Sequence, residues 1–139
     1  MVSYVVNWDE LELMLEKAFG GMFIRDKSNL VGTPKIVGRT ANIPAMKSEF
    51  LVGSWTIAQP SIINGITYSQ SGWKPEDYWE LQINGETLFT VYTKEQAERK
   101  SFQSIMPVNT GDTVMIIHHN VSGNSKQCWA DLELLQIGG

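Results

Sequence analysis

Tyr78-Trp79-Glu80-Leu81-Gln82-Ile83 is the first of two neighbouring segments that carry the clearest strand signal in the chain. It is followed by Asn84-Gly85 and then by the second segment, Glu86-Thr87-Leu88-Phe89-Thr90-Val91-Tyr92. In the first segment the apolar residues Trp79, Leu81 and Ile83 occupy every second position, so they share one face. The residues between them share the opposite face, which is the pattern of a sheet with one side buried. Asn-Gly tolerates the positive φ angles that a type I′ turn needs at both central positions. The stretch therefore predicts an antiparallel hairpin.

Short alternating segments continue on both sides of this hairpin. They cover residues 47–58, 66–70, 101–108, 113–119 and 126–135, and the turn signals between them include Asn64-Gly65 and 109–112. The polar segment 93–100 fits one helical turn or a long loop. About eight strands with turns at roughly ten-residue spacing are typical of a β-sandwich or barrel. Because several connections are long, we expect a mostly β protein, an antiparallel β-sandwich of jelly-roll type.

The N-terminal region has a different pattern. Asn7 is a suitable N-cap, and from residue 8 to residue 19 apolar residues recur at steps of three and four until Gly20-Gly21. This predicts one amphipathic helix, whose apolar face is a candidate assembly surface formed by Leu11, Met14, Leu15 and Phe19. Gly and Pro then punctuate residues 26–46, which favours an extended arm. We expect residues 1–46 to be a helix and arm without independent folding, and residues 47–139 to be the sandwich domain.

The charge, the length of the apolar runs and the cysteine count argue against several classes of protein. The net charge of −4 with scattered Lys and Arg argues against a nucleic-acid binder. No apolar run approaches the roughly 18 residues needed to span a bilayer, so we expect no membrane insertion. The N-terminus lacks the basic and apolar regions of a signal peptide. The single Cys128 cannot form an intrachain disulfide. We expect a soluble protein that is synthesised in the cytoplasm without a signal peptide.

Candidates for metal binding and catalysis are weak. His118 and His119 are adjacent, so in a strand they point to opposite faces and cannot share one metal. Calcium stays open only if loops carrying oxygen ligands converge; these ligands are Glu76, Asp77, Asp112, Asn120, Asn124 and Asp131. Glu80, Asp131 and Glu133 could approach one another on strands, but no spacing selects a glycosidase pair, and no serine lies in a nucleophile elbow. We expect no catalytic residue, no metal site and no cofactor, and hence no enzyme.

Aromatic residues offer a more specific candidate. Trp73 lies at the centre of a polar loop over residues 70–77, and sugar rings stack on exposed indole and phenol faces. The candidate glycan-binding residues are Trp73, Tyr78, Gln82 and Tyr92. In the alternative interpretation Trp55, Trp79 and Trp129 fill the core, and Trp73 only caps a sheet edge.

The C-terminal half resembles small β-sandwich structural proteins encoded by phages and prophages of low-GC Gram-positive bacteria. The resemblance is carried by residues 77–86, 92–95, 108–112, 119–126 and 129–133. It implies a noncatalytic virion subunit, such as a head decoration, neck or tail component, and hence a virion localisation. It also implies partners, namely further copies of the chain in a homo-oligomer and other virion proteins. The resemblance does not cover residues 1–46, and our hypothesis is that the N-terminal helix and arm dock on a neighbour. The alternative is a carbohydrate-binding module or host-surface adhesin that uses exposed aromatics, and the two functions are compatible.

Overall fold

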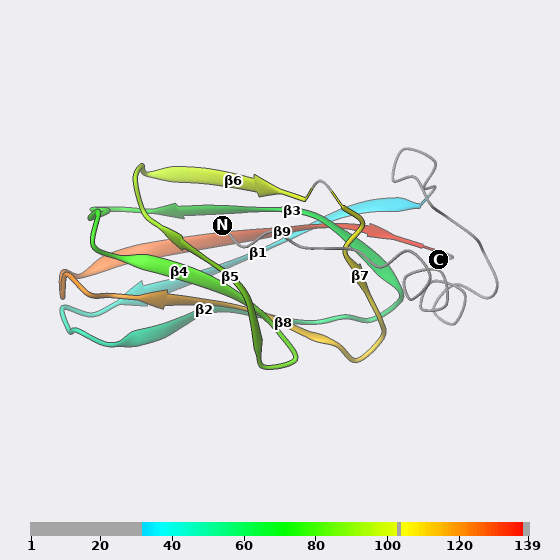
Figure 1. Ribbon diagram of the computed structural model, residues 1–139, viewed down its shortest axis with the longest axis horizontal. Helices are drawn as coiled ribbons and strands as arrows, with labels where there is room; N and C mark the ends of the chain where they lie inside the picture. Colours follow the sequence, from blue (N-terminus) through cyan, green and yellow to red (C-terminus); the bar gives the residue numbers. More distant parts are fainter. Residues whose placement is uncertain (1–31, 103, 138–139) are drawn as a thin grey trace.

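The fold is seen in a computed structural model, which describes residues 32–102 and 104–137. These residues contain no helix and form nine strands. The strands are β1 (Thr33–Ile43), β2 (Glu49–Thr56), β3 (Ser61–Gln70), β4 (Tyr78–Ile83), β5 (Glu86–Tyr92), β6 (Ala97–Ser101), β7 (Pro107–Val108), β8 (Thr113–His119) and β9 (Lys126–Gln136). Most of them run along the long axis of the molecule (Figure 1).

The strands form two antiparallel sheets that pack as a β-sandwich. Sheet A has the order β1-β9-β3-β6, with β7 also pairing with β3, and sheet B has the order β2-β8-β4-β5. Non-consecutive strands are therefore neighbours, because β9 lies between β1 and β3 while β8 lies between β2 and β4. The all-β antiparallel fold confirms the coarse prediction from the sequence.

The hairpin predicted from the sequence is present with the expected ends. β4 and β5 pair from Tyr78 opposite Tyr92 to Ile83 opposite Glu86. The turn between them places Asn84 at φ 52° and Gly85 at φ 84°, the conformation for which an Asn-Gly pair is suited. This is the clearest case in which local residue preference and the final fold agree.

The inner faces of the two sheets form one hydrophobic core. Its largest fully buried side chains include Trp79 and Leu81 from β4, Ile116 from β8, and Ile66 and Leu132 from sheet A. Alternation along each strand leaves the intervening residues on the outer faces, as the in-out burial pattern of β8 and β9 shows. Each sheet therefore has one dry face and one face available to solvent or a ligand.

Three segments differ from the sequence expectations. Residues 33–43, expected in an extended arm, form β1 and pair with β9 along its length, so the sandwich takes in this segment as well. Asn64-Gly65, interpreted as a turn, lies inside β3, where the pairing with β9 shifts by one residue. Gly65 is needed for close packing, because a Cβ there would lie 2.9 Å from the carbonyl oxygen of Lys100. The polar segment 93–100 contributes to the edge strand β6.

Two further expectations concern residues that the structure does not describe or describes only in part. The helix predicted over residues 8–19, and with it Leu11, Met14, Leu15 and Phe19, lies outside the described residues. Of the strand predicted over residues 101–108, the described part includes the end of β6 and the two residues of β7.

Nowhere in the described ranges is there a helix with the length and apolar character required to cross a membrane.

Candidate functional site

Four connecting segments lie at one end of the sandwich, at the left in Figure 1. They are the β1–β2, β3–β4, β5–β6 and β8–β9 connections, and hydrogen bonds join them. The Asn120 side-chain amide donates to the carbonyl oxygens of Met46 at 2.9 Å and Asn124 at 3.0 Å, and the Asn120 backbone N–H donates to Ser48 at 2.9 Å. The backbone N–H of Thr93 donates to Asp77 at 2.9 Å. These bonds link the β8–β9 connection to the β1–β2 connection, and the β5–β6 connection to the β3–β4 connection.

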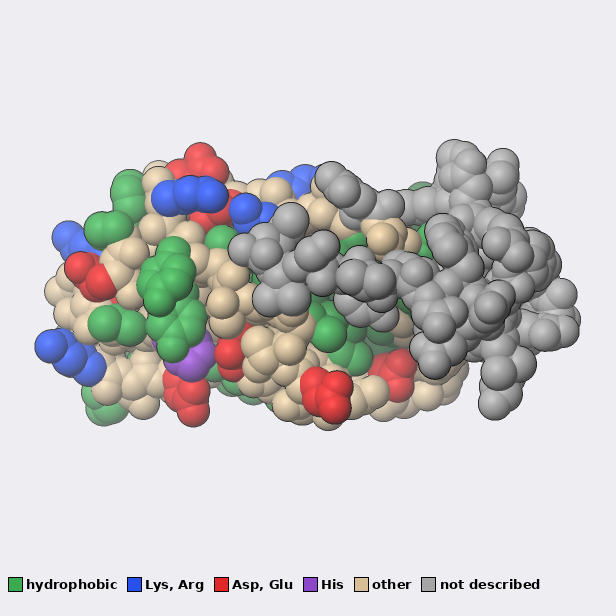
Figure 2. Space-filling model, viewed as in Figure 1, with side chains coloured by type: hydrophobic (Ala, Val, Ile, Leu, Met, Phe, Trp, Pro, Cys, Tyr) green, Lys and Arg blue, Asp and Glu red, His purple; other side chains and the backbone are tan. Residues whose placement is uncertain are grey.

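A row of four side chains crosses the outer face of sheet B next to this end. The strand registers place Glu49 of β2 opposite His119 of β8, His119 opposite Tyr78 of β4, and Tyr78 opposite Tyr92 of β5. We call these four residues the aromatic row. In Figure 2 hydrophobic side chains gather beside a histidine on this face, with acidic side chains close to it. Tyr92 is 62% exposed and Glu49 is an exposed carboxylate, so the row is open at both ends.

The three rings of the aromatic row contact one another. The Tyr78 and His119 rings are stacked, with centroids 4.3 Å apart and an interplanar angle of 10°. The Tyr92 ring is tilted by 42° against Tyr78 at 5.1 Å. His119 also lies between two carboxylates, because its Nδ1 is 3.6 Å from Glu49 Oε2 and its Nε2 is 3.6 Å from Glu80 Oε2. The imidazole therefore lies against a stacked ring and between two acids, and its buried Nε2 makes no hydrogen bond to the described residues.

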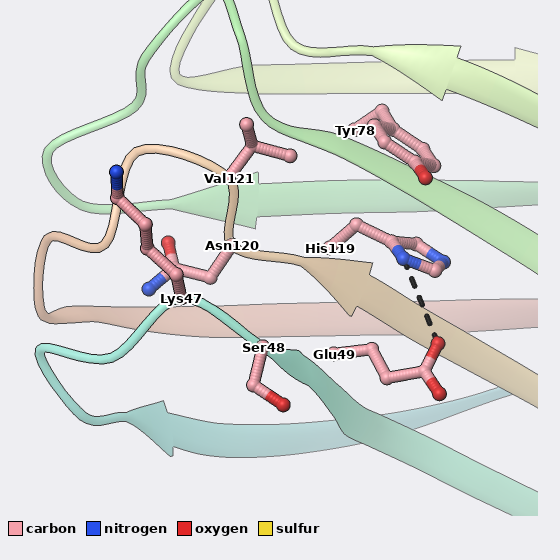
Figure 3. Close-up of a pocket in the computed structure, with 7 residues that line it drawn as sticks. All are labelled: Lys47, Ser48, Glu49, Tyr78, His119, Asn120 and Val121. Atoms are coloured by element: carbon pink, nitrogen blue, oxygen red, sulfur yellow. Dashed lines mark ion pairs between the residues drawn. The ribbon is translucent and has the colours of Figure 1, made fainter.

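A pocket of about 450 Å³ opens beside the stacked rings (Figure 3). Its lining residues are Lys47, Ser48, Glu49, Tyr78, His119, Asn120 and Val121. Figure 3 shows the Tyr78 and His119 rings lying parallel on one side, with Lys47 on the other side, near the β8–β9 connection. The volume falls in the range of small-ligand sites, about 300–1,000 Å³, and the lining combines flat rings with separate donors and acceptors.

Amide and carboxylate groups extend this surface along β4. Gln82 donates from Nε2 to Glu80 Oε1 at 2.6 Å, and Thr87 donates to Glu80 Oε2 at 3.4 Å. Glu80 and Gln82 share the outer face with Tyr78, as the alternation along β4 requires. The outer face of sheet B thus places aromatic faces and hydrogen-bonding groups on neighbouring strands.

Directly beneath the aromatic row lies a buried polar cluster. Lys126 contacts Asp77 Oδ2 through its ammonium group, and neither side chain is exposed to solvent. Ser122 donates to Asp77 twice, from its backbone N–H to Oδ1 at 2.8 Å and from its hydroxyl to Oδ2 at 2.9 Å. The Tyr68 hydroxyl lies 2.6 Å from Nδ1 of the fully buried His118. We call Tyr68, Asp77, His118, Ser122 and Lys126 the internal cluster.

Burial and charge shift the titration of the internal cluster. Burial lowers the pKa of His118 to about 4, with the Lys126 charge adding to this effect, so the imidazole is neutral near pH 7. Burial alone would raise the pKa of Asp77, but the hydrogen bonds from Lys126 and Ser122 outweigh it and the pKa is lowered. Burial raises the pKa values of Tyr68 and Cys128. The cluster is therefore a carboxylate paired with an ammonium group beside a neutral imidazole.

The structure brings together three of the four residues that the sequence predicts as glycan-binding. Tyr78, Tyr92 and Gln82 share the outer face of sheet B. Trp73 lies in the β3–β4 connection, is 37% exposed, and makes none of the ring contacts found among the described residues. Sequence analysis missed His119 and Glu49 as members of the site. The sequence does carry a signal for His119, because alternation places it on the outer face of its strand. It does not show that this strand pairs with the strand that carries Tyr78.

Other candidates from the sequence are separated by the fold. Glu80 lies on the outer face of sheet B, whereas Asp131 and Glu133 lie on the outer face of sheet A, so Glu80 forms no carboxylate pair with either of them. Asp112 is at the opposite end of β8 from Asn120 and accepts a hydrogen bond from the backbone of Asn109 at 2.7 Å. In the described part of the chain no group of three or more His, Cys, Asp or Glu could hold a metal ion. Trp55 and Trp79 are buried, but Trp129 is 38% exposed on the outer face of sheet A.

Comparison with protein families identifies one match. Residues 31–139 match the family described as Domain of unknown function (DUF8551), and the chain belongs to this family. The match begins just before β1 and includes both sheets. A comparison with curated proteins gave no match.

Proposed function

We propose that this chain is a noncatalytic accessory subunit of a phage virion that binds a surface carbohydrate through the aromatic row. The observation that carries the binding part is the alignment of Tyr78, His119 and Tyr92 across three neighbouring strands, with a pocket beside them. The virion part rests on the resemblance of the C-terminal half to phage structural proteins.

The chemistry of the row suits a sugar. Tyr92 presents an exposed ring against which the apolar face of a pyranose can stack, and aromatic rings contribute large contact areas at interfaces. Glu49, Glu80 and Gln82 supply acceptors and an amide for hydroxyl groups on the same face. Two carboxylates, Glu49 and Glu80, outnumber the one lysine of the pocket lining, Lys47, so the surface favours a neutral or amino sugar over an acidic one.

The strand order supports the virion proposal independently of the row. Apart from β7, which makes sheet A five-stranded, the orders β1-β9-β3-β6 and β2-β8-β4-β5 are those that we expect of a jelly roll. This architecture recurs in viral capsid proteins and in lectins. A fold does not establish function, and it is the combination with a ring-lined outer face that favours a virion subunit with a glycan-binding surface.

The binding proposal is tested on an array of neutral, amino and acidic oligosaccharides, followed by calorimetry with any neutral or amino sugar that binds. We expect Tyr92→Ala to weaken binding about tenfold, because it removes the exposed ring on which the sugar stacks, and a tenfold change in affinity corresponds to about 1.4 kcal/mol. Trp129→Ala is the matched control, because Trp129 is an exposed aromatic on the other outer face. Equal affinity of the Tyr92 variant and the wild type would contradict the proposed site.

The virion proposal is tested by the mass of the full chain in solution. If the predicted N-terminal helix is an assembly surface, the full chain forms oligomers measurable by light scattering, and Leu15→Glu with Met14→Glu converts them to monomers. The control is Glu49→Gln on the outer face of sheet B, which leaves the oligomer unchanged. A full chain that is monomeric at all concentrations, and that does not bind purified phage particles, would contradict the virion proposal.

A further inference from the structure

The centre of the internal cluster pairs an amine with a carboxyl group inside the protein. Lys126 is the first residue of β9 in sheet A, and Asp77 immediately precedes β4 in sheet B. Both side chains have zero exposure, and Lys126 Nζ contacts Asp77 Oδ2. A Lys and an Asp are rarely buried to this extent, and the desolvation penalty of such a pair offsets much of its attraction.

The groups around Asp77 treat its two oxygens differently. Oδ1 accepts the backbone N–H of Ser122 at 2.8 Å, which is the arrangement that stabilises negative charge on an oxygen during attack at a carbonyl carbon. Oδ2 faces groups that can supply or accept a proton, namely the Ser122 hydroxyl at 2.9 Å and His118 Nε2 at 3.8 Å. One oxygen is therefore placed to remain on the carbon, and the other is placed to leave.

His118 has an unused ring nitrogen. Its Nδ1 lies 2.6 Å from the Tyr68 hydroxyl, while its buried Nε2 has no hydrogen-bond partner. If the Tyr68 hydroxyl donates to Nδ1, the neutral ring carries its proton on Nε2, which faces Asp77. An unpartnered buried nitrogen is unfavourable in a purely structural cluster, so its orientation toward Oδ2 calls for an explanation.

We propose that Lys126 and Asp77 condense to form an intramolecular isopeptide bond between Nζ and Cγ. A proton first passes from the Lys126 ammonium group to Asp77 Oδ2, which gives a neutral amine and a neutral acid. Nζ then attacks Cγ and forms the C–N bond, while the negative charge on Oδ1 is stabilised by the Ser122 N–H. The C–Oδ2 bond breaks, and Oδ2 leaves as water after taking a second proton that originates from Nζ and passes through His118 or Ser122. The products are one amide and one water, so no oxidant, metal or other co-reactant is needed.

The surroundings of the pair favour this reaction. Holding the amine against the carboxyl group replaces a bimolecular encounter with an intramolecular one. Tyr68, Trp79 and Cys128 are buried residues of the adjoining core, which limits access of the water that would reverse the reaction. The Asp77 carboxyl stays mainly ionised because of its lowered pKa, so we expect a slow reaction that happens once in the life of the molecule.

The bond would join the two sheets. It would link the start of β9 in sheet A to the residue before β4 in sheet B, and it would close the chain segment that contains β4 to β8. A covalent closure of a long segment restricts the unfolded chain, as a disulfide does, but it does not depend on the redox potential of the surroundings. Resistance to unfolding of this kind suits a protein exposed outside the cell.

The test is the intact mass of the purified full chain, measured after denaturation. We expect the mass to be lower than that of the sequence by one water molecule. Digestion should yield a branched peptide that joins the segments containing residues 77 and 126. A chain with the full sequence mass, after prolonged incubation at neutral pH, would overturn the proposal and leave an ordinary buried ion pair.

Two variants separate the roles of the residues. Lys126→Arg keeps a positive charge but has no amine that forms this amide, so it should show the full sequence mass. His118→Gln keeps a polar side chain but cannot relay a proton in the same way, so the bond should form at least about tenfold more slowly in a time course by mass. If His118→Gln forms the bond at the wild-type rate, His118 has no part in the proton transfer.

Discussion

The internal cluster and the aromatic row contain residues that are neighbours in sequence, but the cluster is buried and the row lies on the outer face of sheet B. Asp77 and Tyr78 are neighbours, as are His118 and His119, yet one member of each pair is inside the sandwich and the other is on its outer face. His118 is fully buried next to Tyr68, whereas His119 stacks on Tyr78 between two carboxylates. The backbone of a strand therefore supplies two different chemical environments within one residue step.

The two environments predict which substitutions should affect stability and which should affect binding. Groups of the internal cluster have no water to replace a lost partner, so removing one leaves another buried and unpaired. Groups of the aromatic row can be solvated when a neighbour is removed. The row should therefore tolerate changes that the cluster does not, and the following substitutions compare the two regions.

The largest effect is expected for Lys126→Met. This change leaves the Asp77 carboxylate buried without its cation. Relative to a wild-type chain in which the two residues form an ion pair and no isopeptide bond, breaking the buried pair costs about 3–5 kcal/mol of unfolding free energy. Urea unfolding, followed by tryptophan fluorescence, measures the loss. The control Glu49→Gln, at the exposed end of the aromatic row, should change stability by no more than about 0.5 kcal/mol. A loss below about 1 kcal/mol for Lys126→Met would show that the cluster is not isolated from water.

The next effect is a loss of stability in acid. The pKa of His118 in the folded protein, about 4, lies below its usual value of 6.5, so between these pH values the unfolded chain binds a proton that the folded chain does not. Stability should therefore fall as the pH drops from 6.5 to 4, by about 3 kcal/mol at most. In a chain without the isopeptide bond, the lowered pKa of Asp77 acts in the same direction at still lower pH, because the contribution of the carboxylate is lost on protonation.

Urea unfolding at a series of pH values measures this dependence. His118→Gln should flatten the slope between pH 6.5 and pH 4, whatever its effect on stability at neutral pH. His119→Gln, one residue further on, is the control and should leave most of the slope in place. If the two variants have equal slopes, the acid sensitivity does not come from the buried imidazole.

A smaller effect is expected for Tyr68→Phe. It removes the hydroxyl 2.6 Å from His118 Nδ1 and leaves that nitrogen unpaired in the core, which costs about 1–3 kcal/mol. Tyr92→Phe removes a hydroxyl from an exposed ring and should leave the unfolding free energy unchanged within about 0.5 kcal/mol. Thermal or urea unfolding of the two variants side by side gives the comparison. Equal losses would contradict the distinction between the two regions.

The smallest effect on stability is expected for His119→Phe. The new ring keeps the stack on Tyr78 but loses both nitrogens that face Glu49 and Glu80, so stability should change by about 0.5 kcal/mol or less. Affinity for a neutral or amino sugar that binds the wild type should nevertheless fall, because the orientation of both acids changes. Unchanged affinity would remove His119 from the proposed site and leave the tyrosines as its core.

Parts of the fold could be predicted because their signals are local. The β4–β5 hairpin follows from alternation and an Asn-Gly pair, and the turn over residues 109–112 has Gly111 at φ 91°. Residues 64 and 65 carry the same Asn-Gly signal but lie inside β3. The difference is tertiary, because β3 is paired with β9 on one side and with β6 and β7 on the other, and this pairing keeps the chain extended.

The candidate site was predictable only in part, because part of it depends on pairing between strands that are distant in sequence. Tyr78 and Gln82 share a face by alternation, and Tyr92 follows from the hairpin register, so these three could be grouped from the sequence. Glu49 and His119 come from strands that are distant in sequence, and only the pairing β2-β8-β4 brings them beside Tyr78. Trp73 was grouped with them because it is aromatic, but its place depends on a connecting segment whose path no periodicity determines.

By itself the sequence determined that this chain is a β protein, where its hairpin lies and which side of each strand is apolar, because these features depend on neighbours within a few residues. Only the tertiary structure decided that Lys126 meets Asp77 inside the sandwich and that Glu49, His119, Tyr78 and Tyr92 form one row. Both arrangements depend on which distant strands become neighbours. That choice is made by packing two sheets around one core, which the alternation of a single strand does not encode.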